Sequence, residues 1–139
     1  MSPDSIGAII GIFFILPTIY IVQKKEMGAW VWPLFLTTLP IYYMLFGLIV
    51  MDHSAILKEL LFGLPYFLTG LLAWRVKSPL THYVLALAWL SHGFYDYYHD
   101  LFFVNSGVFD WYPAFCLLID IAVAAYLLIY PSIVKTQKV

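Results

Sequence analysis

The sequence predicts an all-α fold, a polytopic integral membrane protein built as a five-transmembrane-helix bundle. Hydrophobic residues make up 63% of the 139 residues and charged residues only 11%, whereas a soluble domain is about half apolar and a quarter charged. A chain of this length has too small a core to hide so much apolar surface, so the excess is expected to face lipid. Five apolar runs each approach the ~20 residues that a helix needs to cross a bilayer. The runs are continuous, whereas a membrane strand would alternate.

The first three spans are predicted at residues 5–22, 29–50 and 56–74. No basic residue precedes the first run and no small-residue cleavage site follows it, so we expect a retained span and not a signal peptide. Prolines inside all three runs remove helix hydrogen bonds and favour kinks. Tryptophans near the run ends are typical of the interface between membrane and water.

The fourth and fifth spans are predicted at residues 80–103 and 111–130. The fourth run is the longest and contains the densest group of ionisable residues. The fifth begins as helices commonly do, with Asp110 as a candidate N-cap and Pro113 in the first turn. Together the spans leave only short loops, so the chain is expected to be a single transmembrane domain over residues 1–139.

The positions of lysine and arginine predict the orientation of the bundle. Six of the seven basic residues occupy the first loop, the third loop and the tail. They are Lys24, Lys25, Arg75, Lys77, Lys135 and Lys138. With five spans these segments share one side, which is cytoplasmic by the positive-inside rule. We therefore expect an outside N-terminus, a cytoplasmic C-terminus and a multi-pass location in the cell membrane. Most acidic residues fall on the outer half, where they would attract cations.

Four ionisable side chains of the fourth span are predicted to share one face. Because a helix advances about 100° per residue, His92, Asp96, His99 and Asp100 fall within a stripe about 100° wide. Polar groups at membrane depth are costly and usually functional, so this stripe is expected to face the bundle interior. A buried hydrogen-bonded network that only fixes helix packing is the alternative.

Two other spans bring acidic residues to the same depth. Asp120 of the fifth span is expected level with His92, and Cys116, one turn earlier, level with Asp96. Glu59 of the third span enters from the same side and is expected level with His99. Three helices would thus place carboxylates and imidazoles together in the outer half of the membrane.

Imidazoles and carboxylates in one place suit a divalent metal ion, zinc in preference to iron. The predicted metal ligands are His92, Asp96 and His99, although one ion cannot easily reach both histidines across about 10 Å of helix. A pair of ions bridged by Asp96 is therefore an alternative to a single ion. Asp120 and Glu59 are the predicted catalytic residues, either of which could instead complete the ligand set. Residues expected to surround the site are Asp100, Cys116, Tyr95 and Tyr112.

These residues predict a small membrane-embedded, metal-dependent enzyme that hydrolyses or otherwise modifies a lipid-like or amphipathic substrate. Hydrolysis is favoured over oxygen chemistry, with membrane lipid or a lipid-like small molecule as the partner. A homo-oligomer remains open, and nucleic acid is excluded. Two alternatives use the same residues differently: an ion- or proton-coupled transporter or relay, and an accessory subunit of a larger membrane complex. The sequence contains no nucleotide-binding or nucleophile-elbow motif.

Overall fold

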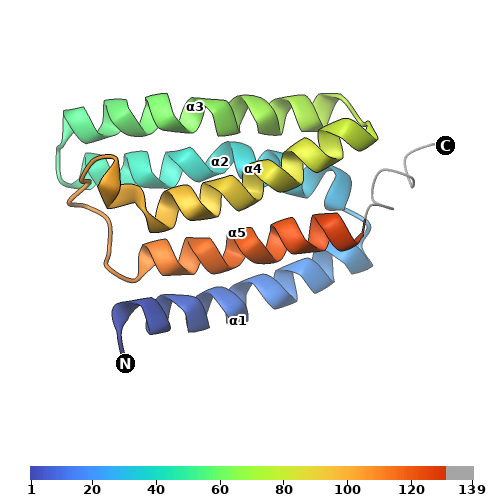
Figure 1. Cartoon of the computed structure of the whole chain (residues 1–139), viewed down its shortest axis with the longest axis horizontal. Helices are drawn as coiled ribbons and strands as arrows, with labels where there is room; N and C mark the ends of the chain where they lie inside the picture. The colour runs from blue at the N-terminus through green and yellow to red at the C-terminus, as the bar shows by residue number, and fades with distance from the viewer. Residues whose placement is uncertain (131–139) are drawn as a thin grey trace.

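A computed structural model describes residues 1–130, which form five α-helices, one 3-10 turn and no strand. The helices are α1 (Pro3–Lys24), α2 (Gly28–Ile49), α3 (His53–Arg75), α4 (Pro79–Tyr97) and α5 (Tyr112–Ile129). They lie side by side and alternate in direction (Figure 1). The all-α prediction is confirmed for this part of the chain. The tail lysines at 135 and 138 lie outside it.

Four of the helices, α1, α2, α3 and α5, are long and apolar enough to cross a membrane. Helix α4 has 19 residues but is not among these four, because its histidines, tyrosines and Asp96 lower its hydropathy. The helix boundaries otherwise lie within a few residues of the predicted runs.

The fourth span is shorter than the sequence predicts. Helix α4 ends at Tyr97, and the 3-10 turn at His99–Leu101 follows it. The prediction of a helix extending to residue 103 is therefore wrong. The physical reason lies in His99, whose ring turns inward and forms a buried hydrogen bond with Glu59, in place of a further turn of regular helix.

Local sequence explains where the helices begin. Ser2 accepts a hydrogen bond from Ser5 N–H at the start of α1, and Asp52 accepts one from Ala55 N–H at the start of α3. Helix α4 begins with a capping box in which Ser78 and Thr81 exchange hydrogen bonds. These caps satisfy backbone groups that a helix N-terminus leaves without partners.

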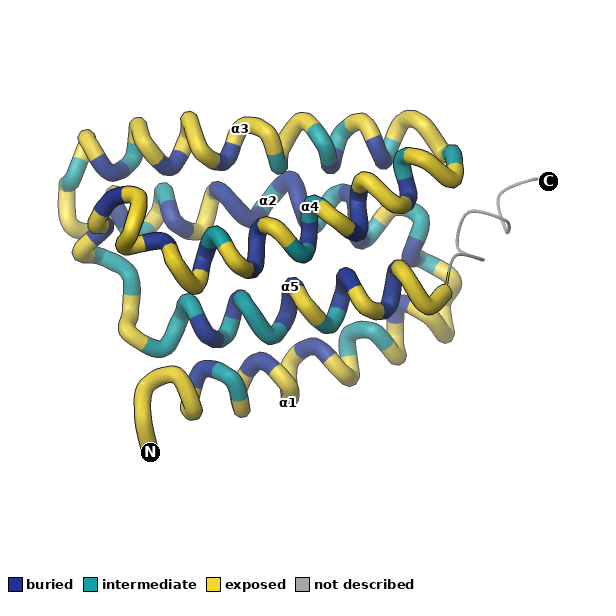
Figure 2. The backbone as a smooth tube through the Cα atoms, in the orientation of Figure 1, coloured by how far each residue is buried: buried dark blue, intermediate teal, exposed yellow. Residues whose placement is uncertain are grey.

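Neighbouring helices pack antiparallel in the pairs α2 with α3, α3 with α4 and α4 with α5, and parallel in the pair α1 with α5 (Figure 1). The centre of the core holds Trp32 of α2 and Trp89 of α4, both fully buried, with ring centroids 6.2 Å apart in an edge-to-face arrangement. Val123 of α5 lies in the same core and is also fully buried. Buried positions line the inner faces of the helices, while the outer faces are exposed (Figure 2).

The exposed faces are apolar, as the composition requires. Phe13 is 77% exposed, Ile49 73% and Leu80 72%. Large apolar side chains exposed on several helices form a far more extensive apolar surface than the isolated patches of an ordinary soluble protein. This extensive exposed apolar surface favours a lipid environment for the bundle.

The two ends of the bundle carry opposite charge. Because the helices alternate in direction, the α1–α2 and α3–α4 turns meet at one end and bring Lys24, Lys25, Arg75 and Lys77 there (Figure 1). The opposite end holds the start of α1, the α2–α3 turn and the α4–α5 connection. Its acidic residues are Asp4, Asp52, Asp100 and Asp110.

Candidate metal centre

Three side chains from α4 and α5 meet inside the bundle: His92, Asp96 and Asp120, called the His–Asp cluster here. His92 Nδ1 lies 2.8 Å from Asp120 Oδ2 and 3.3 Å from Asp96 Oδ2. One ligand atom from each residue lies within 4.8 Å of the other two. All three residues are at most 2% exposed. A group with these donors at these separations could hold a metal ion.

Sequence spacing and a glycine explain why the cluster forms. His92 and Asp96 are four residues apart and therefore lie on one face of α4. Gly93 lies against α5 at the same level, where an added Cβ would come within 2.8 Å of the Asp120 Cβ. The missing side chain thus lets Asp120 approach α4 closely enough for its contact with His92.

Asp96 is the least satisfied member of the His–Asp cluster. It has no exposed surface, and neither of its carboxylate oxygens has a hydrogen-bond partner. Asp120 Oδ1 is likewise buried without a partner. The Nδ1 atom of His92 carries at most one proton and is already within hydrogen-bond distance of Asp120, so it does not satisfy both carboxylates. Buried carboxylates in this state require a cation or their own protons.

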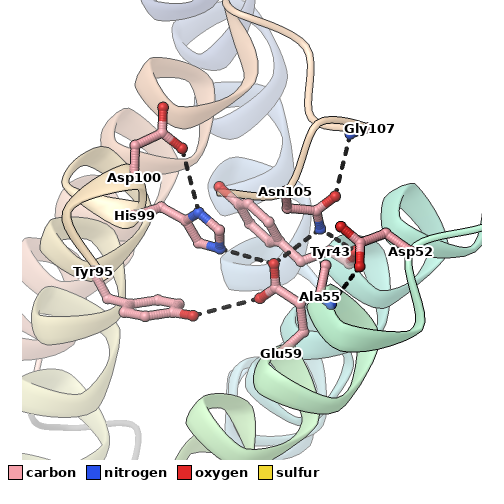
Figure 3. Close-up of polar contacts among 9 residues, drawn as sticks. All are labelled: Tyr43, Asp52, Ala55, Glu59, Tyr95, His99, Asp100, Asn105 and Gly107. Atoms are coloured by element: carbon pink, nitrogen blue, oxygen red, sulfur yellow. Dashed lines mark hydrogen bonds and ion pairs between the residues drawn. The ribbon is translucent and has the colours of Figure 1, made fainter. Parts of the chain in front are cut away.

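A second buried group, the Glu59–His99 cluster, lies beside the α2–α3 turn at Asp52 and the α4–α5 connection at Asn105 and Gly107 (Figure 3). Glu59 Oε1 accepts hydrogen bonds from His99 Nε2 at 2.8 Å and from Asn105 Nδ2 at 3.0 Å. The hydroxyl of Tyr95 donates to Glu59 Oε2 at 3.4 Å. The His99 ring stacks on Tyr43 with centroids 4.9 Å apart. Glu59 is therefore well supplied with donors, in contrast to Asp96.

The charges of the two clusters do not balance. Three buried carboxylates, those of Glu59, Asp96 and Asp120, face only two imidazoles. Among the described residues, no lysine or arginine forms an ion pair with any of the three. Even with both imidazoles protonated, one ionised carboxylate would lack a positive partner, which is costly away from water. A bound divalent cation would remove this imbalance.

The structure separates residues that the sequence groups together. His92, Asp96 and Asp120 meet as the depth argument expects, but His99 does not join them and pairs with Glu59 instead. Asp100 is exposed, and its Oδ1 lies 3.7 Å from His99 Nδ1.

Of the other residues expected around the site, Cys116 lies at the His–Asp cluster, whereas Tyr95 and Tyr112 lie at or near the Glu59–His99 cluster. Cys116 is buried beside Asp96. Tyr95 bonds Glu59, and Tyr112 packs edge-on against Tyr43 with ring centroids 5.4 Å apart.

Two further residues, which the sequence pattern does not indicate, contribute to the clusters. Asn105, in the α4–α5 connection, donates to both Glu59 and the backbone oxygen of Tyr43. Tyr66 of α3 covers His92 edge-on, with ring centroids 4.6 Å apart. An asparagine followed by Ser-Gly reads as a turn, and tyrosines in apolar helices read as interface anchors. Neither pattern therefore indicates a role at the site.

Two cavities reach the clusters from different sides. The polar cavity, about 290 Å³ in volume, lies under the α4–α5 connection and is lined in part by Asp96, His99, Asp100, Asn105 and Asp110. The aromatic cavity, about 340 Å³, lies between α1, α2 and α5 and includes Asp120 in its lining. Each cavity thus borders one buried carboxylate of the His–Asp cluster, the polar cavity Asp96 and the aromatic cavity Asp120.

No protein-family model, no curated protein and no solved structure matches the chain. Carboxylates and an imidazole can hold a divalent ion, position a substrate carbonyl or move a proton.

Proposed function

We propose that this chain is a small membrane-embedded, metal-dependent enzyme that hydrolyses a lipid-like or amphipathic substrate. The single observation that carries the proposal is Asp96, a wholly buried carboxylate without a hydrogen-bond partner, in contact range of a second carboxylate and an imidazole. Protein carboxylates in such a place are normally paired or bound to metal. Zinc is favoured over iron, and His92, Asp96 and Asp120 are the residues that would hold it.

The membrane part of the proposal has five spans, an outside N-terminus and a cytoplasmic C-terminus in the cell membrane. It is supported by the four apolar helices and by the basic end of the bundle. Helix α4 is proposed as the fifth span because its ionisable residues His82, His92 and Asp96 are buried. Exposed positions such as Leu80 and Leu87 are apolar. Positive-inside orientation then makes the basic end cytoplasmic and opens the polar cavity to the outside.

The two cavities fit a hydrolase, because hydrolysis needs water and substrate at one centre. The polar cavity offers water a route to Asp96, and the aromatic cavity offers an apolar substrate a route to Asp120. A bound zinc ion would polarise the substrate carbonyl and activate water at neutral pH. Three protein ligands leave a fourth position open for that chemistry, as catalytic zinc sites do.

Glu59 and His99 are assigned an acid–base role on the polar cavity. Glu59 holds His99 through Nε2, which leaves His99 Nδ1 on the side of exposed Asp100. A carboxylate that orients an imidazole in this way is a recurring arrangement for accepting and returning a proton. Exposed Asp100 gives the proton a path to water.

Ester hydrolysis by the purified protein in detergent tests the proposal, with p-nitrophenyl decanoate as substrate. We expect activity that a chelator removes and added zinc restores. The Asp96→Asn protein should be inactive, while Asp4→Asn, which changes an exposed carboxylate in the first turn of α1, should keep the activity. Hydrolysis that is insensitive to the chelator, or retained in Asp96→Asn, would reject a metal-dependent reaction at this site.

A further inference from the structure

The aromatic cavity occupies a wedge between α1 and α2. These two helices are joined by a short turn at the basic end, yet α1 packs mainly against α5 and makes little contact with α2. The space left between them is about 340 Å³ and is floored by α5. This volume is near the lower end of the range for small-ligand sites in proteins.

Aromatic rings form most of the cavity wall, and a carboxylate lies at its inner end. Phe14 and Phe115 face each other with ring centroids 5.9 Å apart. Asp120, which is 1% exposed and whose Oδ1 has no hydrogen-bond partner, belongs to the lining, as does Cys116 one turn earlier on α5. The other lining residues are Phe35, Leu39, Tyr42, Trp111, Tyr112 and Ile119.

The mouth of the cavity opens onto the outer face of the bundle. Phe14 is 46% exposed and Tyr42 is 39% exposed, and both belong to the apolar surface assigned to lipid. A molecule dissolved in the bilayer would therefore enter sideways between α1 and α2 without crossing water. Its apolar part would contact the rings and its leading polar group would reach Asp120.

We propose that the aromatic cavity binds the single hydrocarbon chain or ring system of a neutral amphiphile, with its polar group at Asp120. The inference rests on the proposed function and names the substrate class of the same site. Size favours one chain, because the cavity is too small for both chains of a phospholipid. Charge favours a neutral molecule, because the lining includes no basic residue to pair with an anionic head group, and Asp120 adds negative charge whenever no metal ion or proton neutralises it.

Photolabelling in phosphatidylcholine vesicles tests this proposal directly. The probe is a monoacylglycerol that carries a diazirine in its acyl chain, and a two-chain phosphatidylcholine with the same diazirine is the matched control. We expect the monoacylglycerol to label peptides containing Phe35 or Phe115, about tenfold more than the control lipid does. Excess unlabelled monoacylglycerol should abolish the signal. Even labelling of all exposed helix faces by both probes would overturn the proposal.

Two variants on opposite sides of the cavity keep the test decisive. Ile119→Phe fills the inner part of the cavity, and Phe14→Ala removes a ring at its mouth. Each should lower specific labelling about tenfold, whereas Ile121→Phe, on the exposed face of the same helix, should leave it unchanged. Unchanged labelling in folded Phe14→Ala and Ile119→Phe proteins would reject the cavity as the binding site.

A charge variant tests the selectivity for neutral molecules. In Asp120→Asn the buried carboxylate is gone, so labelling by a diazirine fatty acid should rise several-fold relative to monoacylglycerol. No change in that ratio would contradict the role of Asp120 in selectivity. The experiments are run on chelator-treated and zinc-loaded protein. Specific labelling of a protein that binds no zinc would uphold the cavity and reject the metal enzyme. Zinc binding without specific labelling would uphold the metal site and reject the cavity as a binding site.

Discussion

Asp96 has no exposed surface and neither of its oxygens accepts a hydrogen bond, although Nδ1 of His92 lies 3.3 Å away. Burying even a neutral polar group without a partner costs about 2–7 kcal/mol, and an ionised one costs more. A metal ion bound at Asp96 would offset this cost, whereas a network that only packs helices would be expected to supply a hydrogen-bond donor. Glu59, with three donors, shows what a satisfied carboxylate in this bundle looks like.

Replacing Asp96 should therefore do more harm than replacing Asp100. Asp96→Asn removes one of the three proposed ligands and should weaken zinc binding at least about 100-fold, since disturbing a mere partner of a ligand already costs about 10–100-fold. Asp100→Asn changes a side chain that is 84% exposed and should leave zinc affinity within about twofold. Isothermal titration of the two purified proteins measures the difference. Equal losses in two folded proteins would contradict the assignment.

His92 and Asp120 should act as one unit. Each alanine variant removes one end of a 2.8 Å contact, so zinc binding should fall strongly in both single variants. The double variant should be little worse than either, with a coupling of about 0.5–3 kcal/mol, as expected for residues in direct contact. Zinc titrations of the four proteins complete the cycle. Additive losses would mean that the two residues act independently.

At the scale of the helices, regular periodicity made much of the site predictable. Four-residue spacing places His92 and Asp96 on one face, and counting from the ends of the spans brings Asp120 to the level of His92. The same counting also places Glu59 level with His99, and the two do form a hydrogen bond, but it does not foresee that α4 ends at Tyr97 and that a 3-10 turn carries His99 to this contact. Apolar periodicity contains no information about such a change in backbone path.

Contacts made by loops and by aromatic side chains could not be predicted from the sequence pattern either. Asn105 reaches Glu59 across 46 positions of the chain, and this contact depends on how the α4–α5 connection folds back over α3. Tyr66 covers His92 because α3 packs against α4 at that level. Both contacts depend on helix packing and side-chain rotamers, which a hydropathy pattern does not specify. Helix number and class, in contrast, follow from the apolar runs.

The approach of α4 to α5 predicts the effect of Gly93→Ala. Alanine is intrinsically better in a helix by about 1 kcal/mol, but its Cβ would lie 2.8 Å from the Asp120 Cβ. Overpacking of this kind costs about 1–3 kcal/mol, so the variant should be less stable and bind less zinc. Ser91→Ala, on an exposed position of α4, is the control for helix propensity. Thermal unfolding in detergent measures both variants, and a more stable Gly93→Ala protein would contradict the packing.

At the scale of the whole molecule, the charged residues are divided between the two ends of the bundle, and the polar cavity lies at the acidic end. Basic residues gather at the end holding the α1–α2 and α3–α4 turns, and acidic residues gather at the end that opens into the polar cavity. An acidic entrance raises the local concentration of cations. The arrangement would therefore supply metal ions and water to the site from outside the cell.

Reporter fusions test this orientation. An alkaline phosphatase domain attached to the N-terminus should be active only if that end is outside, and a fluorescent protein on the C-terminus should fold in the cytoplasm. We expect signals from both fusions, because the basic turns favour the cytoplasmic side. An N-terminus reported in the cytoplasm would turn the polar cavity inward and contradict the proposed access from outside.

Metal content of the purified wild-type protein is the most direct test of the metal centre. Elemental analysis after purification without chelator should find about one divalent ion per chain, zinc above iron, as expected for one set of three ligands. The same analysis of Asp96→Asn should find little metal, and that of Asp100→Asn should match the wild type. Wild-type protein that is folded, contains no metal and takes up none from added zinc would contradict a metal centre at the His–Asp cluster.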